Sequence, residues 1–125
     1  MNDNTLRLVL RLNAANSAIC GAALIVFGGP LADVLGVDRP GWVRLVGAGL
    51  LPFAAALVWV AAGDAERLRR FVPGIVVGDI GWVLASVVTL VAGWYSGVGI
   101  ALVIAMAVLV DGFAMLQWRG VRAIG

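Results

Sequence analysis

Two aspartates in strongly apolar surroundings are the residues whose chemistry most needs an explanation. Asp79 is the one ionised residue of the run "PGIVVGDIGWVLASVVTLVAGW" (73–94), and Asp111 lies in "VLVDGFAMLQW" (108–118). A charged side chain near the centre of a bilayer costs about 2.5–3.5 kcal/mol on insertion scales. Such a carboxylate should turn inward, pair with a partner or take up a proton. Both aspartates are therefore candidates for binding a proton, a cation or a ligand.

Other chemistry has little support, because the chain has no His and only one Cys, Cys20. A Ser or Thr nucleophile needs a base to activate it, which is most often His. Zinc and histidine-ligated haem need ligands that this sequence does not offer. We expect no catalytic residues, no metal and no cofactor, and the sequence favours a protein that is not an enzyme.

The composition is typical of a protein that lies within a membrane. Of the 125 residues, 62% are hydrophobic and 13% are charged, whereas soluble domains carry about 25% charged residues. The nine basic residues are all Arg and are scattered along the chain. A basic face interleaved with aromatic residues is absent, which argues against a nucleic-acid partner.

Four apolar segments are long enough to cross a bilayer, which takes roughly 20 residues of helix. Breaks fall between them at "GGP", "RPG", "AGDAERLRR" and "WYSG". The sequence therefore predicts an all-α integral membrane bundle of four transmembrane helices in one domain, 1–125. The expected spans are about 6–28, 41–62, 71–94 and 97–118.

The first connection contains "PLADVLGVD" (30–38), with Leu31, Val34 and Leu35 at helical spacing. This pattern fits a short amphipathic helix at the membrane interface. It fits an apolar loop equally well, so both alternatives stay open.

The Arg residues are distributed unequally between the two sides of such a bundle. Four spans place both ends of the chain and the connection at 62–70 on one side. The Arg residues on that side are Arg7, Arg11, Arg67, Arg69, Arg70, Arg119 and Arg122, against Arg39 and Arg44 on the other. The positive-inside rule then predicts a multi-pass protein of the inner (cytoplasmic) membrane, with the N- and C-termini in the cytoplasm.

Polar residues of three spans reach a similar depth in the membrane. Asp79, Asp111 and Asn13 each lie roughly 10–12 Å from the cytoplasmic edge, with Arg11 slightly shallower and Asn16 slightly deeper. We therefore expect these five residues to form an intramembrane polar cluster. Such a cluster either holds the helices together or binds a proton or a ligand, and depth alone does not distinguish these roles.

Arg44 lies about 5 Å inside the opposite edge of the second span. Its long side chain can extend to the lipid headgroups. The alternatives are that it binds another anionic group or pairs with Asp33 or Asp38. Arg44 is therefore predicted to contact an anion or a headgroup on the outer side.

Three segments give the chain a loose resemblance to a known group. They are "GWVRLVGAGLLPFAAALVW" (41–59), "GDIGWVLASVVTLVAG" (78–93) and "AMLQWRGVR" (114–122). In these segments the chain resembles small uncharacterised bacterial four-helix membrane proteins, distantly similar to the DoxX-like group. The resemblance implies a four-helix membrane fold. Some members of that group are linked to quinone-coupled sulfur oxidation, but the chain shows no redox motif that would carry this activity over.

Two functional hypotheses follow. The first is a non-enzymatic accessory or interaction subunit of the membrane, in contact with lipids and associating with itself or with other membrane subunits. The glycines Gly74, Gly78 and Gly81 would let a neighbouring helix approach closely. The alternative is a small proton-coupled transporter, or a protein that binds a lipid or a quinone, using Asp79 and Asp111.

Overall fold

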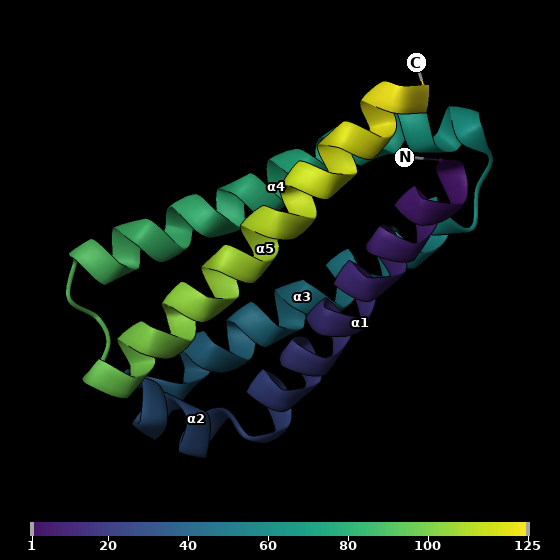
Figure 1. Cartoon of the computed structure of the whole chain (residues 1–125). Helices are drawn as coiled ribbons and strands as arrows, with labels where there is room; N and C mark the ends of the chain where they lie inside the picture. Colours follow the sequence, from purple (N-terminus) through teal and green to yellow (C-terminus); the bar gives the residue numbers. More distant parts are fainter. Residues whose placement is uncertain (1, 125) are drawn as a thin grey trace.

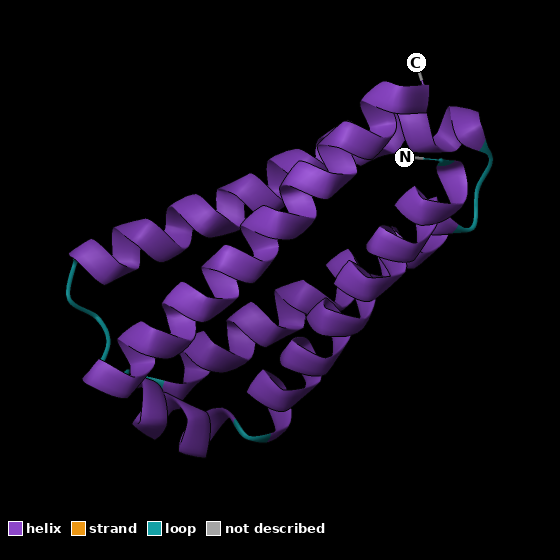
Figure 2. Cartoon of the chain, viewed as in Figure 1, coloured by secondary structure: helices purple, strands orange, loops and turns teal. Residues whose placement is uncertain are grey.

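The computed structural model describes residues 2–124, and within this range the chain forms five α-helices and no strand. Their bounds are α1 (Asp3–Val26), α2 (Gly28–Leu35), α3 (Pro40–Ala61), α4 (Ala65–Val91) and α5 (Gly97–Ile124). All helices but α2 are long and apolar enough to cross a membrane. The predicted all-α, four-helix membrane bundle is confirmed, with short loops between its helices (Figure 2).

The first connection contains a helix rather than a loop. α2 ends where Gly36 adopts a left-handed conformation with φ of 79° and donates its N–H to the carbonyls of Ala32 and Asp33. A residue without a Cβ adopts this conformation at little cost, and glycine commonly ends helices in this way. The segment is therefore helical and not a loop, and its position at the membrane interface stays a prediction.

The third span begins earlier than the sequence pattern suggested. α4 begins at Ala65, not near residue 71, because the carboxylate of Asp64 accepts a hydrogen bond from the backbone N–H of Arg67 at 2.9 Å. This contact caps the helix, and Glu66 adds a favourable negative charge to its first turn. The charged segment that was expected to form a loop is the first turns of α4. At the other end of the chain, α5 continues beyond Trp118 to Ile124.

The four long helices form two pairs. α1 packs along α3, and α4 packs along α5, while α3 and α4 touch each other only slightly. Both ends of the chain lie at the same end of the bundle, and α4 runs away from α3 toward the opposite end, where α2 lies (Figure 1). We call these two ends the terminal end and the α2 end.

The hydrophobic core lies near the terminal end. Its buried side chains are Leu6, Leu10, Ala14, Leu57, Val60, Ala61, Leu68, Val72, Ile75, Val76, Ala114 and Val121. Elsewhere the large apolar side chains face outward, and Val91, for example, is 84% exposed. A soluble protein rarely exposes such an area, whereas lipid tails would cover it. The bundle is thus closely packed toward one end and apolar on its outer surface.

Two glycines bring α1 and α3 into backbone contact. A Cβ atom on Gly47 would lie 2.7 Å from the carbonyl oxygen of Gly21 and 2.9 Å from the Cβ of Leu24. A side chain at this crossing would therefore push the two helices apart. Small residues at such crossings are usual in membrane bundles, because they let helices approach closely.

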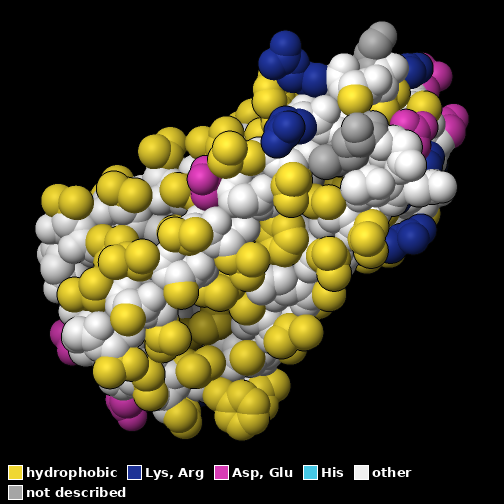
Figure 3. Space-filling model, in the orientation of Figure 1, with side chains coloured by type: hydrophobic (Ala, Val, Ile, Leu, Met, Phe, Trp, Pro, Cys, Tyr) yellow, Lys and Arg dark blue, Asp and Glu magenta, His cyan; other side chains and the backbone are white. Residues whose placement is uncertain are grey.

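Arg side chains gather at the terminal end (Figure 3). Arg7 donates to the carbonyl of Gly63 at 2.9 Å and so joins the start of α1 to the loop between α3 and α4. The guanidinium of Arg67 lies 4.0 Å from the centroid of the Trp59 ring. This combination of Arg and Trp is typical of the boundary between membrane and water.

Candidate functional site: a polar junction beside a cavity

Three polar side chains meet in the interior, one from each of three helices. Asn13 of α1 donates through Nδ2 to Oδ2 of Asp79 in α4 at 3.1 Å, and to Oε1 of Gln117 in α5 at 2.9 Å. Gln117 in turn donates through Nε2 to Oδ2 of Asp79 at 2.7 Å. We call Asn13, Asp79 and Gln117 the polar junction. It links α1 of one helix pair to both helices of the other.

The polar junction is almost completely buried. Asn13 and Gln117 have no exposed surface, and Asp79 is 2% exposed. Each occupies the inward face of its helix together with core residues: Leu10 and Ala14 flank Asn13, Val72 and Val76 precede Asp79, and Ala114 precedes Gln117. 

The hydrogen bonds within the polar junction use the N–H donors of Asn13 and leave part of the acceptor capacity of Asp79 unused. An Asn side chain has two N–H donors, and those of Asn13 point to Asp79 and Gln117. The Asp79 oxygens are not equal: Oδ2 receives two short bonds, whereas Oδ1 receives only a contact of 3.4 Å from Asn13. A carboxylate offers about four lone-pair sites. Oδ1 of Asp79 therefore keeps unused capacity to accept a hydrogen bond.

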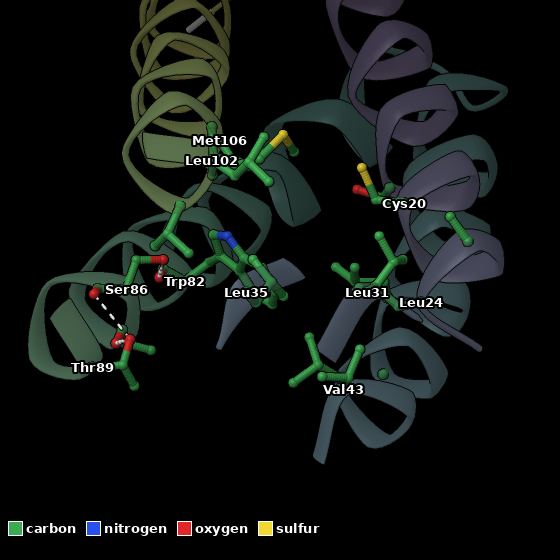
Figure 4. Close-up of a pocket in the computed structure, with 18 of the residues that line it drawn as sticks. Cys20, Leu24, Leu31, Leu35, Val43, Trp82, Ser86, Thr89, Leu102 and Met106 are labelled. Atoms are coloured by element: carbon green, nitrogen blue, oxygen red, sulfur yellow. Dashed lines mark hydrogen bonds between the residues drawn. The ribbon is translucent and has the colours of Figure 1, made fainter. Parts of the chain in front are cut away.

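A cavity of about 680 Å³ begins at the polar junction and extends toward the α2 end. Both Asn13 and Asp79 line it. Its polar lining continues with Asn16, Ser17 and Cys20 of α1 and with Trp82, Ser86 and Thr89 of α4. Figure 4 shows Cys20 on one side of this space and Trp82, Ser86 and Thr89 on the other.

The rest of the cavity wall is apolar and comes from all five helices. The apolar residues include Leu24, Leu31, Leu35, Val43, Leu102 and Met106, which Figure 4 shows around the space. The internal space exists because the helix pairs separate and because several lining residues are small. Gly49 is an example, since a Cβ added there would meet no atom within 4 Å.

The short helix α2 is attached to the start of α5 at the α2 end. Ser96 donates its backbone N–H to the carbonyl of Leu35 and its hydroxyl to the carbonyl of Val34, both at 2.8 Å. The same hydroxyl accepts the N–H of Gly99 at 3.1 Å. Because Leu31 and Leu35 of α2 line the cavity, these bonds hold part of its wall in place.

The structure brings together only part of the polar cluster expected from the sequence. Asn13 and Asp79 are in contact, and the half-buried Asn16 lines the cavity and accepts a hydrogen bond from Cys20 Sγ at 3.8 Å. Arg11 and Asp111 do not join them, because both lie on exposed faces of their helices. The cluster is therefore smaller than expected and contains one carboxylate instead of two.

Gln117 takes the place in α5 that we had expected Asp111 to take. Sequence reasoning missed it, because a neutral amide beside Trp118 and Arg119 reads as part of the membrane boundary. Gln117 follows Val110 by two helical turns and therefore shares its face, but the sequence gives no sign that this face is the buried one. Both residues are buried, whereas Asp111 is rotated by about 100° to the outer face.

Arg44 lies outside the cavity at the α2 end. It is exposed, and its aliphatic carbons pack on Gly28, where an added Cβ would lie 2.6 Å from Cγ of Arg44. Its contact with an anion or a headgroup stays a prediction.

Metal binding finds no support in the part of the chain that the structure describes, residues 2–124. No group of three or more His, Cys, Asp or Glu side chains in this range could hold a metal ion.

Comparisons with protein-family models, with curated proteins and with solved structures give no match. The resemblance to the DoxX-like group therefore stays a prediction.

Proposed function

We propose that the protein binds a membrane-soluble small molecule in the cavity between its helix pairs. The observation that carries this proposal is the combination of a cavity of about 680 Å³, apolar walls and one buried carboxylate at its inner end. Ligand sites are typically concave spaces of about 300–1,000 Å³, mostly apolar, with a few polar groups that orient the ligand. A lipid or a quinone is the class of ligand expected from the sequence.

The position of the site in the bundle supports a ligand that arrives from the bilayer. The outer surface is covered by apolar side chains, and the loops are short (Figures 1 and 3). Within residues 2–124 the loops between the helices are too short to enclose a water-soluble substrate. We propose that the bundle lies in the inner (cytoplasmic) membrane with both termini in the cytoplasm, as the Arg residues at the terminal end favour. Fusions of green fluorescent protein and alkaline phosphatase to the C-terminus test this orientation.

A variant that fills the cavity tests the binding function. Gly49→Phe places a ring in the cavity, and Gly74→Phe is the matched control, because both glycines have open space around them but Gly74 does not line the cavity. The probe is the neutral fluorescent amine N-phenyl-1-naphthylamine, titrated into each protein in detergent micelles. Energy transfer from tryptophan to the bound probe is the signal.

We expect the wild type and Gly74→Phe to bind the probe with equal affinity. Gly49→Phe should bind it at least about tenfold more weakly. Equal binding by all three proteins would contradict the proposal, because the probe would then lie in the micelle or on the outer surface. Mass spectrometry of organic extracts from the wild type and Gly49→Phe adds a second readout. A native ligand should co-purify with the former and be depleted in the latter.

An interaction subunit is the second candidate function. The supporting observation is that Gly74 and Gly81 of α4 are exposed and seven residues apart, so they share one outward face with open space around it. Another helix could approach closely there. Gly74→Phe should then lower the dimer fraction measured by crosslinking in native membranes, with Gly49→Phe as the control. An unchanged dimer fraction, or no dimer in the wild type, would argue against this candidate.

A further inference from the structure

We infer that the polar end of the ligand is a cation, so that the cavity selects lipophilic amines or quaternary ammonium and phosphonium ions over quinones and anionic lipids. This inference rests on the proposed function and assigns the ligand class of the same site. Three features carry it: the missing counter-charge at Asp79, the direction of the hydrogen bonds in the polar junction, and the aromatic side chains around the cavity.

The first feature is the charge of the polar junction. Every hydrogen bond that Asp79 receives within residues 2–124 comes from a neutral amide, either Asn13 or Gln117. Arg11, which we had expected in the same polar cluster, lies on an exposed face of α1. A buried carboxylate is strongly stabilised by a positive partner. A cationic ligand would supply the charge that the protein does not.

The second feature is the direction of hydrogen bonding. The donors of Asn13 are used within the junction, and Oδ1 of Asp79 keeps acceptor capacity beside the cavity. A quinone or a phosphate brings further acceptors to this oxygen and would be repelled. An ammonium group brings N–H donors, and a quaternary cation brings positive charge. The carboxylate therefore favours cations over both alternatives.

The third feature is the aromatic lining. Trp82 follows Asp79 by three residues on α4, so both lie on one face, and both line the cavity. Figure 4 shows the Trp82 ring extending from α4 into the space between the helix pairs. Phe53, Trp42 and Tyr95 also line the cavity. Aromatic faces attract cations, and the attraction strengthens when the cation is removed from water.

The size and the walls of the cavity argue against a small inorganic ion. A hydrated ion would leave most of a 680 Å³ apolar space unfilled and would find a single carboxylate as its ligand. A cation with a large apolar body fills the space with the groups that its walls accommodate. The expected occupant is thus an organic cation that partitions into membranes.

A pair of ions with the same shape and opposite charge tests the inference. Tetraphenylphosphonium and tetraphenylborate are titrated into the detergent-purified wild type, with quenching of tryptophan fluorescence and isothermal calorimetry as readouts. Micelles of the same detergent without protein show how strongly each ion partitions into the detergent alone. We expect the cation to bind about 10-fold to 100-fold more tightly than the anion, as one charge-assisted contact implies.

Two carboxylate variants locate the effect. Asp79→Asn removes the buried charge, and Asp111→Asn removes an exposed one from α5 as the matched control. The ratio of the dissociation constants of the anion and the cation should fall to about one in Asp79→Asn. It should stay at its wild-type value in Asp111→Asn. Binding of the neutral probe N-phenyl-1-naphthylamine shows whether the cavity of each variant is intact. If Asp79→Asn does not fold, Trp82→Leu is used instead. This variant should weaken binding of the cation more than binding of the neutral probe.

The outcomes separate this inference from the function on which it rests. If the neutral probe binds in the cavity but the wild type shows no preference for the cation, or prefers the anion, the cationic ligand class is wrong and the binding function stands. If no probe binds in the cavity, the binding function itself is wrong. A cation preference that survives equally in Asp79→Asn would also overturn the inference, because another group would then be its source.

Discussion

Gly47 of α3 faces Gly21 of α1 so closely that a Cβ on Gly47 would lie 2.7 Å from the Gly21 carbonyl oxygen. Two residues further along the same helix, Gly49 lines the cavity and has no atom within 4 Å of the same position. One helix therefore uses glycine in two ways: at a helix crossing and beside an open space.

This difference predicts opposite effects for the same substitution at the two positions. Gly47→Ala should lower the free energy of unfolding by about 1–3 kcal/mol, because the added methyl forces the α1 and α3 backbones apart. Gly49→Ala should raise it by about 0.5–1 kcal/mol, because alanine favours the helix and meets no neighbour. Unfolding by sodium dodecyl sulfate in mixed micelles, followed by circular dichroism, measures both. Changes of the same sign would show that the crossing is not as close as described.

The polar junction should stabilise the bundle far more than the exposed carboxylate does. Gln117→Leu removes the 2.7 Å bond to Asp79 and the acceptor of Asn13. Because it leaves one N–H of the buried Asn13 amide unpaired and removes one of the two bonds to Oδ2 of Asp79, it should cost about 1–3 kcal/mol of unfolding free energy. Asp111→Asn, on the outer face of the same helix, should not lower stability, because an outward-facing charge in an apolar span is itself costly. The same unfolding assay compares them, and equal losses would contradict the assigned positions.

The attachment of α2 to the start of α5 depends in part on the side chain of Ser96. Ser96→Ala removes the hydroxyl that donates to Val34 and accepts from Gly99. Losing these bonds should cost about 1 kcal/mol, and the effect should be local. Hydrogen–deuterium exchange should become faster in residues 28–37 and stay unchanged in the core helices at the terminal end. Thr5→Ala, which removes an exposed hydroxyl at the terminal end, should leave exchange in residues 28–37 as it is.

Arg67 should contribute through its planar guanidinium and not only through its charge. The group lies 4.0 Å from the Trp59 ring centroid and donates to the Trp59 carbonyl at 3.1 Å. Arg67→Lys keeps the charge but loses the planar stacking, and should cost about 0.5–1 kcal/mol and change the Trp59 fluorescence. Arg69→Lys, in the same turn of α4 and exposed, is the control. A similar change in both variants would show that the stacking of Arg67 on Trp59 is not the source of the effect.

The fold was largely predictable because the length and the hydropathy of each span are properties of the chain itself. A helix that crosses a bilayer must satisfy its backbone internally, so an apolar run of sufficient length has few other outcomes. The start of α4 was missed for a local reason. "DAERLRR" reads as a charged loop, but Asp64 caps a helix there, and the Arg side chains extend along its surface.

The candidate site was predictable only in part, because Asn13 and Asp79 were expected to lie together but Gln117 was not expected beside them. Asp79 meets Gln117 of α5, which lies six residues beyond Asp111, or about 9 Å along the helix, so Asp79 and Asp111 do not share one level in the bundle. Which of them faces inward depends on how α5 packs against α4 and α1. An apolar helix such as α5 has similar residues on every side, so its pattern does not reveal its buried face. The cavity depends on the angle between helix pairs, which no local pattern encodes.

The hydrogen bonds of the polar junction also have an order in time. Asn13 is synthesised 66 residues before Asp79 and 104 residues before Gln117. α1 is also the least hydrophobic of the four long helices, with a mean hydropathy of 1.5 against 2.4 for α5. The hydrogen bonds that the amide of Asn13 makes in the folded chain therefore cannot form until α4 and α5 have been synthesised. The polar junction is completed only when α5, the last helix of the chain, packs against α1 and α4.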